Sequence, residues 1–214
     1  QPTITLDSPN GGEVLAMGAS VNITWTASDN IAVTGVTVQY SATGGSGWST
    51  LATGEANDGV FAWTVPPAAT TQGLFRVTAF DANGNSASDQ SNATFEVRDQ
   101  TLPVITLTNP AGPVVWTPGN ATVITWTASD NVGVTGVDID FSRDDGGSWT
   151  PLAAGEPNDG SFPWTVADLN TTTGILRLTA HDAAGNSGTS QASDIVVQPI
   201  VPVTLVSFLA TRDA

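Results

Sequence analysis

The chain has 214 residues, with 20 acidic against five basic side chains, a formal net charge of −15, one histidine and no cysteine. So acidic a surface repels a phosphate backbone, which excludes nucleic acid as a partner. Without cysteine there is no disulfide framework, thiolate zinc site or thiol nucleophile. No apolar run approaches the roughly 18 residues of a membrane span, and no charged, apolar leader opens the chain. We therefore expect Gln1 to begin a mature or trimmed chain.

Seven short strands are predicted along the first hundred residues, as runs rich in β-branched residues between clusters of Gly, Asn, Asp and Pro. Within one of them, Val21, Ile23 and Trp25 point to one face and the polar residues between them to the other. This alternation is typical of a sheet with one buried and one solvated face. Such strands must pair two sheets into a sandwich. The predicted strands are residues 3–6, 21–26, 36–40, 48–52, 61–65, 75–80 and 93–97.

The second half of the chain repeats the first at an offset of 101 residues. The hexapeptide WTASDN occupies residues 25–30 and 126–131. Aligned without a gap, residues 2–98 and 103–199 are identical at 46 of 97 positions. Two copies of one domain are therefore expected, over residues 1–100 and 101–199. Pro103 restrains the residue before it to an extended shape, so the linker between the copies is expected to be short and stiff.

A tail at residues 200–214 follows the second copy. Its segment VPVTL is similar to LPVITL at residues 102–107, the first predicted strand of the second copy. The tail is therefore expected to resemble the first strand of a further unit. Three roles remain open for this apolar strand: it completes its own domain, it is the stub of a removed domain, or it adds to a neighbouring copy by strand complementation.

Several motifs of each copy resemble those of known extracellular modules. The segment VNITWT at residues 21–26 resembles the second strand of a fibronectin type III or immunoglobulin-like domain, whose Trp fills the core. SPNGGE at residues 8–13 and WTVP at 63–66 are similar to the Ser-Thr-rich cell-wall module family, which is related to a yeast cell-wall protein. The resemblance implies an all-β fold of two tandem seven-stranded antiparallel immunoglobulin-like (fibronectin III-like) β-sandwiches. It also implies a part in secreted hydrolases or cell-surface proteins.

Two polar loops at one end of each predicted sandwich carry oxygen ligands of the kind that Ca²⁺ takes. This arrangement resembles the interdomain calcium sites of bacterial adhesin repeats, in which a linker Asp meets loop aspartates. The alternative is that these Asp and Asn side chains only cap turns through their own backbone. The candidate ligands are Asp29, Asn30, Asp81 and Asn85 in the first copy, and Asp130, Asn131, Asp182 and Asn186 with linker Asp99 in the second.

Four other features are weaker candidates. Glu55 and Asp58, repeated as Glu156 and Asp159, could form a catalytic carboxylate pair, but NDG is also ordinary hairpin-turn sequence. Residues 142–149 resemble the Asp-box hairpin of sialidases, which is a folding unit there. His181 replaces Phe80 of the first copy, which indicates a half-buried structural position. Trp116 has no counterpart Trp, so it is the tryptophan to inspect for an exposed sugar platform.

The sequence therefore predicts a non-enzymatic extracellular structural or adhesive module, with calcium stiffening the interdomain joint. Its expected partners are other domains of a parent protein, or neighbouring copies through the tail strand, with polysaccharide as a further candidate. Two alternatives remain open: a self-assembling surface filament subunit, and a carbohydrate-binding accessory region of a secreted hydrolase.

Overall fold

The computed structural model describes residues 1–198, and the predicted tail strand lies outside them. The chain divides into two compact units: unit 1 is Gln1–Thr101, and unit 2 begins at Leu102. The described residues form strands and turns without an α-helix. Accordingly, the described part of the chain offers no helix that could span a membrane.

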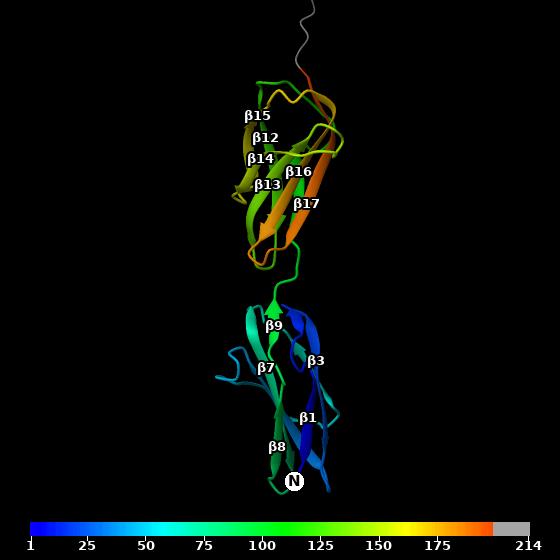
Figure 1. The fold of residues 1–214 in the computed structure, drawn as a ribbon, viewed down its shortest axis with the longest axis vertical. Coiled ribbons are helices and arrows are strands. Elements are labelled where there is room, and N and C mark those ends of the chain that lie inside the picture. The colour runs from blue at the N-terminus through cyan, green and yellow to red at the C-terminus, as the bar shows by residue number, and fades with distance from the viewer. Residues whose placement is uncertain (199–214) are drawn as a thin grey trace, which may run out of the picture. The chain divides into compact units, whose positions relative to one another are not determined.

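Unit 1 is a sandwich of two sheets whose strands pair antiparallel, except for one short parallel pair (Figure 1). The smaller sheet has the order β1 (Thr3–Ser8), β3 (Ser20–Ser28), β6 (Val60–Thr64). The larger sheet has the order β2 (Val14–Ala16), β9 (Phe95–Arg98), β7 (Thr70–Asp81), β4 (Val33–Ser41), β5 (Ser49–Glu55), with β8 (Ser86–Gln90) also paired to β7. All seven predicted strands are present. The sequence analysis missed β8 and the three-residue β2, which pairs in parallel with β9.

Unit 2 has the same topology (Figure 1). Its smaller sheet is β10 (Val104–Asn109), β12 (Ala121–Ser129), β15 (Ser161–Thr165). Its larger sheet is β11 (Val114–Trp116), β17 (Ser187–Val197), β16 (Thr171–Asp182), β13 (Val134–Ser142), β14 (Thr150–Glu156). The predicted all-β fold of immunoglobulin-like sandwiches is confirmed.

A tryptophan on the central strand of the smaller sheet closes each core. Trp25 is only 3% exposed, so its indole N–H needs a partner inside the protein. Its Nε1 donates to Oδ1 of Asn57 at 3.2 Å, and Nδ2 of Asn57 donates to the Ala27 carbonyl at 3.0 Å. Trp126 and Asn158 repeat this arrangement in unit 2. The asparagine of the NDG hairpin therefore holds the core tryptophan in place by accepting its indole N–H; we call this hydrogen bond the tryptophan lock.

The gapless alignment of the two copies is wrong in the last strand. Gly73 pairs with Phe95 in unit 1, and the equivalent Gly174 pairs with Ile195, so the offset there is 100 residues. Unit 2 has therefore lost one residue from the turn that separates β8 and β9 in unit 1. The deletion joins the two strands into the single β17, with Asp194 at a φ of 59°.

Replacing Asn57 with Ala should lower the free energy of unfolding of unit 1 by about 1–3 kcal/mol, because the buried indole N–H loses its acceptor. Chemical denaturation monitored by tryptophan fluorescence measures the change. Asn22→Ala, at an exposed position of β3, is the control and should have little effect. Equal stability of the Asn57 variant and the parent protein would show that the lock contributes nothing.

Candidate functional site

One end of unit 1 holds a buried carboxylate at the end of β3. The Asp29 side chain is 1% exposed, and its Oδ2 accepts the backbone N–H of Ile31 at 2.9 Å. Its Oδ1 is buried and has no hydrogen-bond donor among the described residues. The α-ammonium group of Gln1 lies 3.3 Å from this oxygen. A positive group therefore meets the oxygen that lacks a hydrogen-bond donor.

The same position in unit 2 has the same unusual feature. Oδ1 of Asp130 accepts the N–H of Val132 at 3.4 Å, while Oδ2 is buried without a hydrogen-bond donor among the described residues. A carboxylate oxygen of Asp130 and one of Asp182 lie within 4.8 Å of each other. The structure thus brings together two predicted ligands from different loops, since Asp130 follows β12 and Asp182 ends β16.

Asp81 and Asp182 also hold the turns that follow β7 and β16. Oδ1 of Asp81 accepts two backbone N–H groups, from Asn83 at 2.9 Å and Asn85 at 2.8 Å, and Oδ2 accepts the Asn85 side-chain amide. The pKa of Asp81 is lowered, chiefly by the hydrogen bond from that amide. The Asp182 turn repeats this geometry. Turn capping, the alternative interpretation of these residues, therefore accounts for both oxygens of Asp81 and of Asp182. Asp29 and Asp130, by contrast, each have one oxygen without a hydrogen-bond donor among the described residues.

The remaining predicted ligands surround these carboxylates in sequence. Asn30 and Asn131 directly follow the two buried aspartates and are exposed. Asn85 and Asn186 donate their side-chain amides to the turn aspartates at 2.6 and 2.7 Å. Linker Asp99 belongs to unit 1, where its Oδ1 accepts the N–H of Thr101 at 3.1 Å.

In both units the aspartate of the candidate catalytic pair holds a hairpin turn, and the glutamate ends the preceding strand. Oδ1 of Asp58 accepts the N–H of Val60 at 3.2 Å, and Oδ1 of Asp159 accepts the N–H of Ser161 at 3.0 Å. The neighbouring asparagines are used in the tryptophan locks. The geometry therefore favours the turn interpretation over acid–base chemistry.

The hairpin that resembles an Asp-box is held by the side chain of Asp144. The Ser148 hydroxyl donates to Oδ2 and the Ser148 N–H to Oδ1, both at 2.7 Å, and the Ser142 hydroxyl also donates to Oδ1. These bonds, led by that of the Ser148 hydroxyl, lower the pKa of Asp144. Every oxygen of this carboxylate thus serves the turn, which favours a folding role here too.

His181 joins a polar ladder on the outer face of the larger sheet of unit 2. Its Nε2 lies 2.9 Å from Oδ2 of Asp138, and its Nδ1 lies 2.9 Å from the Ser187 hydroxyl. Partial burial opposes ionisation of Asp138, but hydrogen bonds from the Gly155 N–H and from His181 lower its pKa overall. The half-buried structural position that the sequence predicts is therefore held by polar hydrogen bonds rather than by an apolar contact.

Trp116, the tryptophan that the sequence singles out for inspection, is buried: it is 7% exposed and packs edge-on against Trp164. The deletion near Asp194 does not affect this strand, which still turns Trp116 into the core in the place of Leu15. Trp48 and Trp149 are half-buried, and their rings are covered by the guanidinium groups of Arg76 and Arg177, at 4.4 and 3.9 Å. Sequence analysis missed these pairs, although both arginines recur at the repeat offset.

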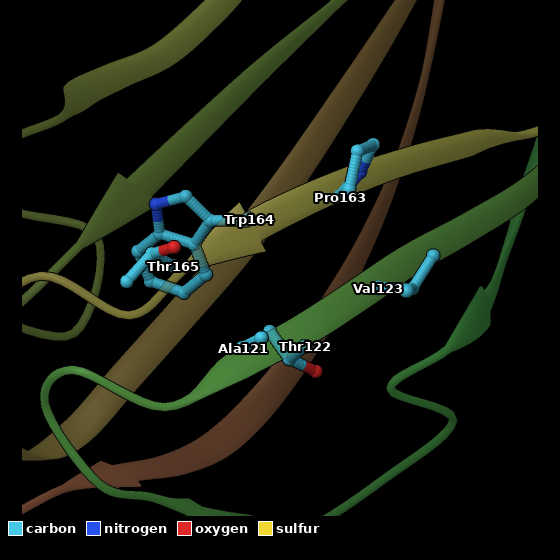
Figure 2. A pocket seen from close by; sticks show the side chains of 6 residues that line it. All are labelled: Ala121, Thr122, Val123, Pro163, Trp164 and Thr165. Atoms are coloured by element: carbon cyan, nitrogen blue, oxygen red, sulfur yellow. The ribbon is translucent and has the colours of Figure 1, made fainter.

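A shallow depression of about 230 Å³ lies beside the half-buried Trp164. Figure 2 shows its lining, which comes from the adjacent strands β12 and β15. It is smaller than the usual 300–1,000 Å³ of a ligand pocket, and none of its lining side chains titrates. The lining residues are Ala121, Thr122, Val123, Pro163, Trp164 and Thr165.

Asp144→Asn should destabilise unit 2 at pH 7 and lose this effect in acid. The folded-state pKa of Asp144 lies below its unfolded value of about 3.9, so its contribution is complete above that value and disappears as the pH falls through the folded pKa. Urea denaturation at pH 7 and at about pH 2 measures the difference from the parent protein. Asp145→Asn, in the same hairpin, is the control. A destabilisation that persists undiminished in acid would contradict the assignment.

Comparison with known proteins gives one family and several solved structures. Residues 2–97 match the sequence model of the bacterial Ig domain family. No curated protein matches the chain. Fibronectin(III)-like modules of Clostridium thermocellum CbhA are 19% identical, with 92% of this chain and 95% of that chain covered and a TM-score of 0.42. A 1.5-MDa bacterial ice-binding adhesin is 18% identical over 92% of this chain and 64% of that one, with a TM-score of 0.32. The N-terminal Ig1-2 module of a Drosophila receptor protein tyrosine phosphatase is 15% identical, covering 92% and 98%, with a TM-score of 0.31.

Proposed function

We propose that this tandem is a non-enzymatic extracellular structural or adhesive module whose interdomain joint is stiffened by calcium. Residues 2–97 match the sequence model of the bacterial Ig domain family, and the second unit repeats them. Bacterial Ig domains are typical of surface and secreted proteins. The described residues give no support to catalysis, because the candidate carboxylate pair is used in turns.

The observation that carries the calcium proposal is the buried oxygen without a hydrogen-bond donor that Asp29 and Asp130 share. Burying an ionised carboxylate is costly unless it is paired or coordinates a metal ion. Turn capping accounts for the other oxygen of each carboxylate, which accepts a backbone N–H, but not for the burial of this one. Its recurrence at the same position of both copies supports a common role for the two sites.

Covalent geometry makes Asp99 a natural third carboxylate for the unit 2 site. Val104 is five residue steps further along the chain, a reach of at most about 18 Å when extended. Val104 pairs with Ser129, which directly precedes Asp130. The linker therefore enters unit 2 beside the loop that holds the candidate ligand, as the sequence analysis expects for Asp99.

Calcium is the cation that this set of ligands favours. Every candidate ligand is a carboxylate or amide oxygen, and the residues come from separate loops and a linker, as suits the six to eight oxygens and flexible geometry of Ca²⁺. Magnesium demands a near-ideal octahedron and retains its waters, which suits such a set less well. Calcium would neutralise three neighbouring carboxylates and so hold the linker against unit 2, whereas without it their repulsion would loosen the joint.

The filament and polysaccharide alternatives have less support. Strand complementation needs the tail at residues 200–214, which lies outside the described residues. Sugar binding needs an exposed aromatic face, but Trp116 is buried and arginines cover Trp48 and Trp149. Sedimentation of the chain with and without residues 200–214 tests the first, and a polysaccharide pull-down tests the second.

Removing calcium should lower the stability of the parent protein, whereas Asp130→Asn should raise the stability of the chelated protein. In excess calcium, at 100 times the dissociation constant, the parent protein gains about 2.7 kcal/mol over the chelated form. Asp130→Asn should abolish this gain and yet stabilise the chelated protein, because it removes an uncompensated buried charge. Thermal unfolding and calorimetric titration of chelated protein measure both effects.

Asp159→Asn makes the same change in the hairpin turn and is the matched control, with the calcium response retained. The proposal fails if chelated parent protein binds no calcium, or if Asp130→Asn binds it with the parent's affinity. A lower stability of the chelated Asp130 variant would show that the carboxylate is satisfied without a cation.

A further inference from the structure

A glycine in β17 marks a point where the backbone of the linker segment packs directly on a strand. Gly188 pairs with Ala180 in the interior of the larger sheet of unit 2. A Cβ built on Gly188 would overlap the carbonyl group of Pro103. Glycine within a strand is typical of sites where another backbone approaches closely. No side chain at position 188 is compatible with this position of Pro103.

Unit 1 shows that the fold itself does not require glycine here. The equivalent residue is Ala87 in β8. It pairs with Ala79 in β7, just as Gly188 in β17 pairs with Ala180 in β16. A methyl group thus fits the strand and its sheet. The two copies of the fold thus differ at this position, with Ala87 in unit 1 and Gly188 in unit 2. In unit 2 the close approach of the Pro103 carbonyl leaves room for glycine alone.

We infer that Gly188 provides a packing site for the backbone of Pro103, which we call the seat of the linker. We also infer that this seat positions the linker for the cation site, and this second part rests on the proposed function. Two contacts hold the first strand of unit 2 on β17: Pro103 lies against Gly188, and the Leu107 N–H donates to the Ser190 hydroxyl at 3.0 Å. Pro103 has a fixed φ and restrains Leu102. Asp99 lies four residues before Pro103 in the chain.

The seat lies at the end of the sheet where the candidate ligands gather. Gly188 pairs with Ala180, two residues before Asp182, and Val104, the residue after Pro103, pairs with Ser129 beside Asp130. A side chain at position 188 must displace the Pro103 carbonyl, and with it the start of the tether that carries Asp99. Gly188 therefore acts on cation affinity through the linker, without being a ligand.

The test is Gly188→Ala, with Ala87→Gly as the matched control in unit 1. We expect calcium affinity of the Gly188 variant to fall about tenfold or more, as when a residue that orients a metal ligand is lost. Its unfolding temperature in chelator should stay near that of the parent, because unit 1 folds with alanine at this position. Asp99→Asn should lower the calcium affinity of the parent protein. In the Gly188→Ala background the same change should lower the calcium affinity little further.

A second readout tests the seat without calcium. Trypsin cleavage after Arg98, at the start of the linker, should become several-fold faster in chelated Gly188→Ala, while cleavage after exposed Arg143 supplies the internal reference. Ala87→Gly should change neither rate. Unchanged cleavage after Arg98 overturns the seat. Faster cleavage in a protein that binds no calcium upholds the seat but refutes its link to the cation, and the proposed function fails with that link.

Discussion

A carboxylate oxygen that is buried without a hydrogen-bond donor is the constraint on which the proposed function depends. Removing a carboxylate from water costs several kcal/mol even after the protein relaxes around it. In unit 1 the α-ammonium of Gln1 lies against the buried oxygen of Asp29. In unit 2 a second carboxylate, that of Asp182, lies within 4.8 Å of one of the Asp130 oxygens. A second negative charge makes the cost greater, and the proposed calcium ion would offset it.

The turns around these carboxylates would orient the proposed cation site before an ion binds. Three donors from the turn after β16 fix Asp182, as three donors from the turn after β7 fix Asp81. A carboxylate that is already oriented loses little further freedom when it binds an ion. The turn-capping and ligand roles are therefore compatible: the capped aspartates provide a rigid frame, and Asp29 and Asp130 provide the unsatisfied oxygen.

Much of the fold could be predicted because it follows from local patterns. The alternation around Trp25 predicted a strand with one buried face, and the 101-residue repeat carried each strand into the second copy. The sequence did not predict that the counterparts of β8 and β9 form the single strand β17 in unit 2. The two copies differ there by one residue in a turn, and the alignment without a gap did not show this difference. The burial of Trp116 was missed because the three-residue β11 is too short to show alternation.

The candidate site was only partly predictable. Residue type and loop position were enough to group Asp29 with Asp81 and Asp130 with Asp182. Sequence alone could not show which oxygens serve the turns and which lack a donor, because all four residues have the same chemistry. Nor did it single out Gly188, since its role lies in how closely the backbone of Pro103 approaches, and that distance is visible only in three dimensions.

The most direct measurement is anomalous X-ray diffraction from crystals grown with calcium. The account predicts an anomalous peak about 2.3–2.6 Å from Oδ2 of Asp130, with oxygens of Asp182 and Asp99 among its neighbours. An ordered Asp130 carboxylate in saturating calcium, with no anomalous peak beside it, would contradict the account.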